Sequence, residues 1–126
     1  MKEIDLGELM QTGDIEQKQK TLNKIEDLIA DINPVLLSFP KCERHEMVAE
    51  IKHCMHIAME RSIEANRKYY KKTTLQELDV EIEKLRKYIR IAYRLKYLSK
   101  RQYEYWSDRI NEIGKLVGGW INSVKR

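Results

Sequence analysis

Cysteine and histidine side chains, which can bind metal ions or act as nucleophiles, gather in one short segment of the chain. Cys42, His45, His53, Cys54 and His56 fall within fifteen residues. Thiolate and imidazole groups hold zinc when four ligands converge on one point. On a helix that buries Cys54, however, His53 and His56 point outward, so the groups diverge. We therefore predict surface histidines, a small buried thiol and no bound metal.

Groupings typical of catalysis are missing from the sequence. It contains no glycine-flanked serine of the kind that serves as an acyl-transfer nucleophile, and no glycine-rich loop for phosphates. The carboxylates Glu77, Asp79, Glu81 and Glu83 suggest acid–base work, but Glu83 stands four residues before Lys87. Pairs at that spacing are typical of a solvated helix surface. We predict a noncatalytic protein without a cofactor.

Positive charge is the stronger indication of function, because it is concentrated in one part of the chain. The formal net charge is +4, yet the eighteen residues from 84 to 101 contain eight lysines and arginines and no acid. Just upstream, four more cations surround Tyr69 and Tyr70, so charge and stacking surface occur together. Such surfaces suit phosphates and bases. The candidate nucleic-acid-binding residues are Arg67, Lys68, Lys71, Lys72, Lys84, Arg86, Lys87, Arg90, Arg94, Lys96, Lys100 and Arg101.

Chemistry alone leaves a protein partner and an ordinary solvated surface open beside nucleic acid. An anionic membrane would also attract the charge, but neither a membrane nor an ordinary surface requires eighteen residues without an acid. The longest apolar runs are far shorter than the roughly 18 residues of a membrane span. The N-terminus lacks the apolar stretch of a secretion signal, and two cysteines are too few for a disulfide framework. We expect a cytoplasmic protein with reduced thiols and no membrane contact.

Four helices must position these residues, because apolar residues recur at alternating spacings of three and four in four segments. Short connections favour antiparallel neighbours. We predict an all-α fold: an antiparallel up-down-up-down four-helix bundle over residues 14–126, preceded by an N-terminal extension, residues 1–13, that we expect to be mobile. The apolar seams are Leu22, Ile25, Ile29, Ile32 and Leu36, then Met47, Ile51, Cys54, Ala58 and Ala65, then Leu75, Leu78, Ile82, Leu85, Ile89 and Ala92, and last Tyr103, Trp106, Ile110, Ile113, Val117, Trp120 and Val124.

The helix boundaries are predicted from local signals. Pro40 closes the first helix, and the second begins near Cys42. Two pairs of residues have the spacing of a capping box, in which a side chain satisfies orphan backbone donors at a helix start. The pairs are Thr74 with Glu77 and Ser99 with Gln102, and they mark the third and fourth helices.

Three glycines near the end of the fourth helix point to close packing. Each costs a helix about 1 kcal/mol relative to alanine, and Gly114 and Gly118 share one face, so another backbone can approach there, within or between subunits. Trp120 follows directly and continues the apolar seam, either as core or as an anchor at a subunit contact. The candidate oligomer-interface residues are Gly114, Gly118, Gly119 and Trp120.

Five short segments in order carry a resemblance to a known family. They are Phe39–Arg44, Glu64–Arg67, Leu78–Glu81 with Leu85 and Arg86, Gln102–Glu104, and Glu112–Gly114 leading to Gly118–Ile121. Over roughly residues 20 to 124, the chain resembles the four-helix-bundle family of 23S rRNA intervening-sequence proteins. Within that family it is most similar to the accessory variability determinants of diversity-generating retroelements.

The resemblance implies a noncatalytic subunit that assembles as a homopentameric barrel. It also implies two kinds of partner, a reverse transcriptase and nucleic acid (template RNA and cDNA), in the service of mutagenic retrohoming. By matching position, Arg86 and Arg90 belong to the basic surface of the family. The alternative is a structural or interaction oligomer of the same fold that has no polymerase partner.

Overall fold

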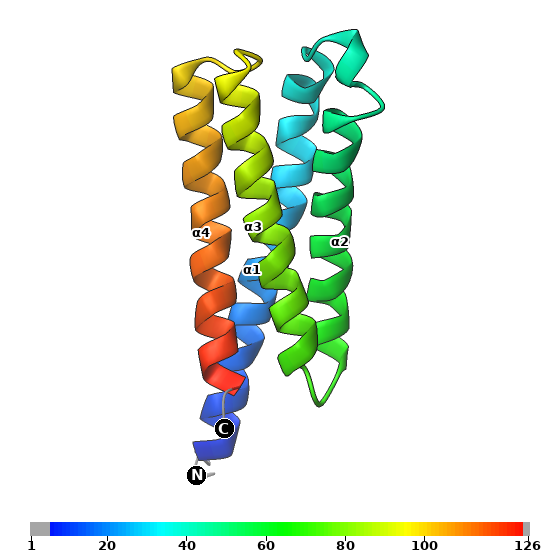
Figure 1. Ribbon diagram of the computed structural model, residues 1–126. Helices are drawn as coiled ribbons and strands as arrows, with labels where there is room; N and C mark the ends of the chain where they lie inside the picture. Colours follow the sequence, from blue (N-terminus) through cyan, green and yellow to red (C-terminus); the bar gives the residue numbers. More distant parts are fainter. Residues whose placement is uncertain (1–5, 125–126) are drawn as a thin grey trace.

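Four long helices lie side by side in the computed structural model of the chain (Figure 1). The structure describes residues 6–124, with side chains from residue 18 on. This part of the chain comprises α1 (Leu6–Leu37), the 3-10 helix η1 (Lys41–Glu43), α2 (Met47–Arg67), α3 (Lys72–Arg94) and α4 (Lys100–Val124), and it contains no strand. The predicted all-α fold of four helices is confirmed.

Each helix packs against two others, in the order α1, α2, α3, α4 and back to α1. The α2–α3 connection lies at one end of the bundle, and the α1–α2 and α3–α4 connections lie at the other (Figure 1). Helix α3 therefore runs from one end to the other. Its 23 residues separate its two ends by about 33 Å at 1.5 Å per residue.

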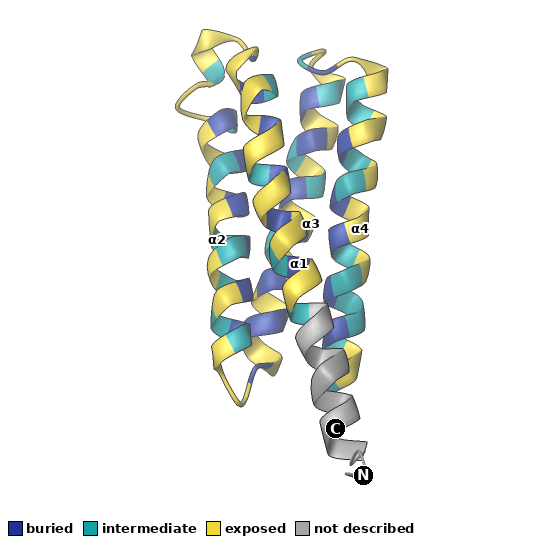
Figure 2. Ribbon diagram, turned by 180° about the vertical axis from the view of Figure 1, so that it is seen from behind, coloured by how far each residue is buried: buried dark blue, intermediate teal, exposed yellow. Residues whose placement is uncertain are grey.

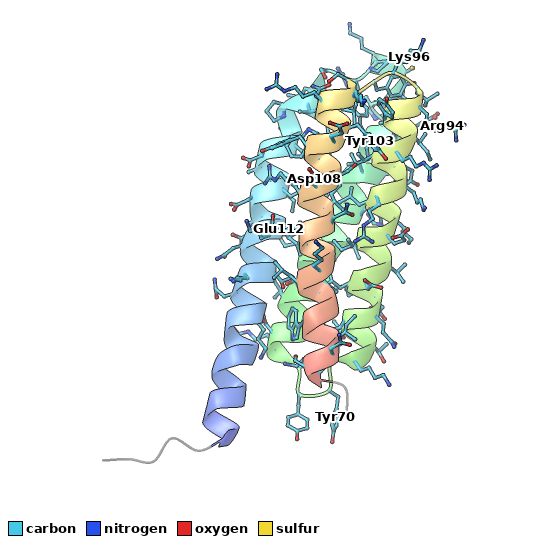
Figure 3. All side chains as sticks on the ribbon, turned by 90° about the vertical axis from the view of Figure 1, so that its left-hand side faces the viewer. Tyr70, Arg94, Lys96, Tyr103, Asp108 and Glu112 are labelled. Atoms are coloured by element: carbon cyan, nitrogen blue, oxygen red, sulfur yellow. The ribbon has the colours of Figure 1, made fainter. Side chains whose placement is uncertain are left out.

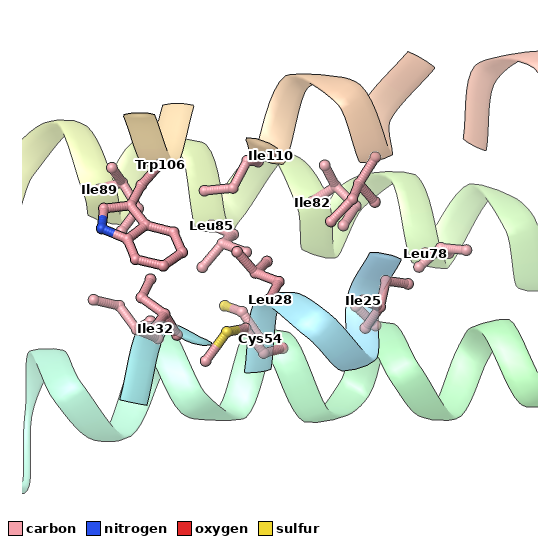
Figure 4. Close-up of a cluster of buried hydrophobic side chains, with 14 of the residues drawn as sticks. Ile25, Leu28, Ile32, Cys54, Leu78, Ile82, Leu85, Ile89, Trp106 and Ile110 are labelled. Carbon is pink, nitrogen blue, oxygen red and sulfur yellow. The ribbon is translucent and has the colours of Figure 1, made fainter. Parts of the chain in front are cut away.

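The core is formed by one stripe of each helix facing the bundle axis (Figure 2). All six residues of the predicted α3 seam are at most 1% exposed, and side chains of all four helices converge on them (Figure 4). In α1 the buried stripe includes Leu28 and Thr21, whereas Leu22 and Ile29 are only half-buried. The predicted seams are otherwise buried or half-buried.

Helix starts agree with the sequence in one case and differ in two. The Ser99–Gln102 capping box at α4 is confirmed: Ser99 N–H donates to Gln102 Oε1 at 2.9 Å, and Gln102 N–H donates to Ser99 Oγ at 3.1 Å. The predicted start of the second helix near Cys42 is wrong, because Pro40 is extended and residues 41–43 form η1 instead, so α2 begins at Met47.

The capping box predicted at Thr74 and Glu77 is also wrong. Helix α3 begins at Lys72, so Thr74 lies inside the first turn, where it is buried and its Oγ1 lies 3.2 Å from the Lys68 ammonium. The Glu77 carboxylate pairs with Arg61 Nε at 2.8 Å. Thr74 and Glu77 are thus bonded to Lys68 and Arg61 instead of to the backbone, and no side chain caps the start of α3.

The predicted boundary between an extension and the bundle, at residue 14, falls inside α1, which begins at Leu6. Residues 1–5 lie outside the described part, and the expected mobility of 1–13 stays a prediction. No helix between residues 6 and 124 combines the length and apolar character that crossing a bilayer requires.

Trp120 is completely buried by its own chain, as predicted, and its indole Nε1 has no hydrogen-bond partner among the described residues. We expect Trp120→Ala to lower the free energy of unfolding by about 3–5 kcal/mol, because it leaves a large cavity. Trp120→Phe should cost clearly less, since it keeps most of the apolar volume and removes the unpaired N–H. Chemical denaturation followed by circular dichroism measures both. A Trp120→Ala variant that melts like the parent while an oligomer dissociates would favour the subunit-contact alternative instead.

Candidate nucleic-acid interface

The predicted cations lie along α3, in the α2–α3 connection and at the start of α4. All except Lys71 and Arg86 are exposed. Lys71 is only 8% exposed, because its side chain is covered where the backbone turns into α3. Its assignment to a surface that contacts phosphates is therefore corrected. The other eleven cations differ in whether a carboxylate already neutralises them.

Cations in the middle of α3 are paired with acids one turn away. Lys84 Nζ lies 3.2 Å from Glu81 Oε1, while Arg86 Nη1 and Lys87 Nζ lie 2.7 and 3.6 Å from the two oxygens of Glu83. The hydrogen bond from Arg86 lowers the pKa of Glu83, so the carboxylate stays charged at neutral pH. The middle of α3 thus presents a largely compensated surface, which the acid-free segment starting at residue 84 did not indicate.

Arg86 also ties α3 to α4. Its Nε donates to Asn111 Oδ1 at 2.9 Å. A Cβ added to Gly114 would collide with the Arg86 guanidinium, so this glycine makes room for a side chain of its own subunit. Within one chain, the neighbour of Gly114 is therefore the Arg86 side chain and not another backbone. A contact between Gly114 and another subunit stays a prediction. At Gly118 an added Cβ would meet nothing within 4 Å.

A second group of cations, at the end of the bundle where α3 gives way to α4, is uncompensated. These five side chains are exposed, and within the described residues none has a carboxylate within 4 Å. Figure 3 shows Arg94 and Lys96 at this end. Uncompensated charge of one sign in one place attracts polyanions. We call this group the α3–α4 basic cluster; it consists of Arg90, Arg94, Lys96, Lys100 and Arg101.

The backbone beneath this cluster is held in a defined shape. Lys96 has φ of 65°, and its N–H donates to Tyr93 O at 2.9 Å, while Tyr97 N–H donates to Ala92 O at 2.9 Å. This is the Schellman termination of a helix, in which glycine usually occupies the left-handed position. The rings of Tyr93 and Tyr103 stack at 4.5 Å and join α3 to α4 just below. A lysine therefore occupies a position where it costs local stability.

A third group lies at the opposite end of the bundle. Tyr69 and Tyr70 are each 87% exposed, and their rings meet edge to face with centroids 4.8 Å apart. Tyr70 stands at this end in Figure 3, far from Lys96. We call this group the α2–α3 loop cluster; it consists of Arg67, Lys68, Tyr69, Tyr70 and Lys72. The two clusters at the ends of the bundle are thus about 33 Å apart, with the compensated cations of α3 between them.

The cysteine and histidine segment behaves as the helical spacing predicts. His53 and His56 are exposed, and Cys54 is buried. Burial and the neighbouring Glu81 raise the pKa of the Cys54 thiol to about 11, so it is protonated at neutral pH. Glu50 and His53 have the Glu-x-x-His spacing of some metal sites, but both are exposed. No group of three or more His, Cys, Asp and Glu side chains in the described part of the chain is arranged to hold a metal ion.

Comparison with known proteins gives one result at the level of the family. A family model described as bAvd-like matches residues 18–124, which is most of the chain: α1 from residue 18 on and the whole of α2, α3 and α4. No curated protein and no solved structure matches the chain.

The left-handed backbone at Lys96 generates a stability prediction. Lys96→Gly should raise the free energy of unfolding by about 0.5–1 kcal/mol, because glycine adopts φ above zero without steric cost. Lys84→Gly, in the middle of α3, should lower it by about 1 kcal/mol and serves as the matched control. Thermal and urea denaturation measure both variants. Destabilisation by Lys96→Gly would mean that the lysine side chain itself stabilises the α3–α4 connection.

Proposed function

The chain belongs to the bAvd-like family, that of bacterial accessory variability determinants, and we propose from this that it is a noncatalytic accessory protein of a diversity-generating retroelement. In this role it binds a reverse transcriptase together with template RNA or cDNA in the cytoplasm. The observation that carries the nucleic-acid part of the proposal is the α3–α4 basic cluster, five exposed cations without carboxylate partners among the described residues.

Binding at the α3–α4 basic cluster is electrostatic. Each lysine or arginine that meets a phosphate releases a condensed counterion, so affinity falls steeply with salt and depends little on sequence. Arg90 and Arg94 are four residues apart and project from the same side of α3, which suits successive phosphates along a backbone. The protein performs no bond-making step in this proposal; it holds nucleic acid near the polymerase.

Assembly multiplies these contacts. We propose that the chain is an antiparallel up-down-up-down bundle and that five copies form a ring, with Gly118 and Gly119 near the contact between subunits. Both glycines are half-buried in the single chain. A ring would repeat the α3–α4 basic cluster five times, and linked sites bind a long polyanion far more tightly than one site does.

Apolar side chains on the outer face of α3 support a protein contact. Val80 and Ile91, in α3, are 52% and 41% exposed, and Leu95, directly after the helix, is 49% exposed. Large exposed apolar residues on one face are typical of an interaction surface. They fit either a neighbouring subunit or the polymerase. A structural oligomer without a polymerase partner is the alternative function, and a reverse-transcriptase gene beside the coding gene would argue against it.

The cluster is tested by removing charge where it is uncompensated. In Arg90→Ala, Arg94→Ala, Arg101→Ala, we expect weaker binding to all sequences and a salt slope, d log K/d log[salt], smaller by about 2–3, at 0.7–0.9 per lost phosphate contact. Arg86 is left intact because it joins α3 to α4. The control is Lys20→Ala, Lys24→Ala, Lys115→Ala, which removes three exposed cations of α1 and α4 away from the α3–α4 connection. Equal losses in both triple variants, by fluorescence anisotropy, would refute the assignment of the site.

Assembly is tested by mass. Light scattering after size-exclusion chromatography should give five times the 15.1 kDa of one chain. Gly118→Ala should keep or raise the stability of the subunit, since the added methyl group meets open space and alanine favours helix by about 1 kcal/mol. The same change should lower the oligomer mass if a neighbouring subunit approaches there, whereas Asn33→Ala, at an exposed position of α1, should not. A monomeric parent at tens of micromolar protein would contradict the ring.

A further inference from the structure

Two tyrosines at the α2–α3 connection have no role in holding the fold. Tyr69 and Tyr70 are the most exposed large apolar side chains of the described chain, at 87% each, and they contact each other rather than the core. A chain that needed only a polar turn here would not expose two aromatic rings to water. Their position therefore calls for an external partner.

The connection that carries the rings is short and fixed at both sides. Lys68 N–H donates to Glu64 O at 2.9 Å at the end of α2, and Lys68 Nζ lies 3.2 Å from Thr74 Oγ1 in α3. Lys71 is buried, and its carbonyl accepts from Leu75 N–H at 2.9 Å. Only the two tyrosines stand free between these anchors. Little conformational freedom of the backbone is lost when a ligand binds to such a platform.

Charge around the rings is positive and uncompensated. The two nearest carboxylates on α2 and α3, Glu64 and Glu77, are both engaged by Arg61, at 3.0 and 2.8 Å. Arg67 and Lys72 flank the tyrosines, are exposed, and have no carboxylate partner among the described residues. An anionic ligand thus meets two cations and two aromatic faces in one place.

We propose that the α2–α3 loop cluster is a second nucleic-acid site, which binds unpaired nucleotides of RNA or DNA by stacking bases on Tyr69 and Tyr70 while Arg67 and Lys72 contact the phosphates. Base stacking on exposed aromatic rings is the main means by which proteins hold single strands. In a duplex the bases already stack on each other and cannot reach the rings. This site therefore selects single-stranded segments, which the α3–α4 basic cluster does not.

The inference rests on the proposed nucleic-acid binding and refines it. The two clusters lie about 33 Å apart, so a short oligonucleotide occupies one of them at a time. Tyrosines beside lysines also occur at membrane interfaces, but this cluster has no leucine, phenylalanine or tryptophan to enter the acyl region. An anionic membrane is therefore the less favoured ligand and is included as an arm of the test.

The test compares labelled oligonucleotides, single-stranded RNA and DNA and a blunt-ended duplex of the same length, by fluorescence anisotropy. Tyr69→Ala, Tyr70→Ala should weaken binding of the single strands about tenfold or more and leave duplex binding within about twofold. Tyr69→Phe, Tyr70→Phe should restore single-strand binding, because the stacking face is kept. Leu37→Ala, which shortens another exposed apolar side chain (75%), is the matched surface control. Circular dichroism and oligomer mass verify that each variant folds like the parent.

The outcomes separate this inference from the proposed function. A parent protein that binds none of the oligonucleotides would overturn both. A parent that binds single strands and duplex, with neither affinity altered by the double alanine variant, would overturn the stacking site and leave nucleic-acid binding standing. Loss of binding to phosphatidylserine vesicles in that variant, with oligonucleotide affinity unchanged, would assign the tyrosines to a membrane. A photo-crosslink from 5-iodouridine in the single strand to Tyr69 or Tyr70 would support the proposal directly.

Discussion

Burial of the α3 seam against α2 and α4 determines where every charge on this helix lies. Six apolar residues from Leu75 to Ala92 are removed from water along its whole length, and truncating even one such leucine or isoleucine typically costs 2–5 kcal/mol. Rotating α3 to place its cations elsewhere would expose this seam and bury charge at the same time. The outward direction of Arg90 and Arg94 is thus a consequence of the core. The proposed binding surface is positioned by packing on the opposite side of the same helix.

Ion pairing then decides which of the outward cations are available to a polyanion. Glu81 and Glu83 neutralise cations in the middle of α3. Near the start of α3, Arg61 of α2 pairs with both Glu64 and Glu77. Among the predicted binding residues, the exposed ones without a carboxylate partner in the described part of the chain lie at the two ends of the bundle. The pairs are exposed and each is worth little to stability; their effect is on the charge that a ligand meets. Charge counted along the chain therefore predicts a basic protein, and only the pairing shows two separate basic places.

Periodicity was sufficient to predict that four helices form and which side of α3 is buried, because the spacing of the six apolar α3 positions and the Ser99–Gln102 cap are both local features of one helix. The misplaced features depend on partners distant in sequence or on the path of a turn. Thr74 is engaged by Lys68, and Gly114 accommodates an arginine 28 residues earlier in the chain. Lys71 is covered where the chain turns, although its sequence neighbours are exposed. Arginine and lysine side chains reach too far for spacing alone to assign their partners.

Each end of the bundle has a feature that lowers the stability of the fold locally. The two features differ, and they suggest which kind of contact each end makes with a ligand. At one end Lys96 adopts a backbone conformation that favours glycine, and at the other Tyr69 and Tyr70 leave apolar surface in water. Neither feature improves the core, since the seams end before both. One supplies a cation and the other supplies stacking surface. In the function proposed above, the first contacts any phosphate backbone, whereas the second contacts only a strand whose bases are free. In that proposal, the length of α3, about 33 Å, separates the general electrostatic contact from the strand-selective contact. A nucleic acid that engages both ends must then present an unpaired segment at a fixed distance from the rest of its backbone.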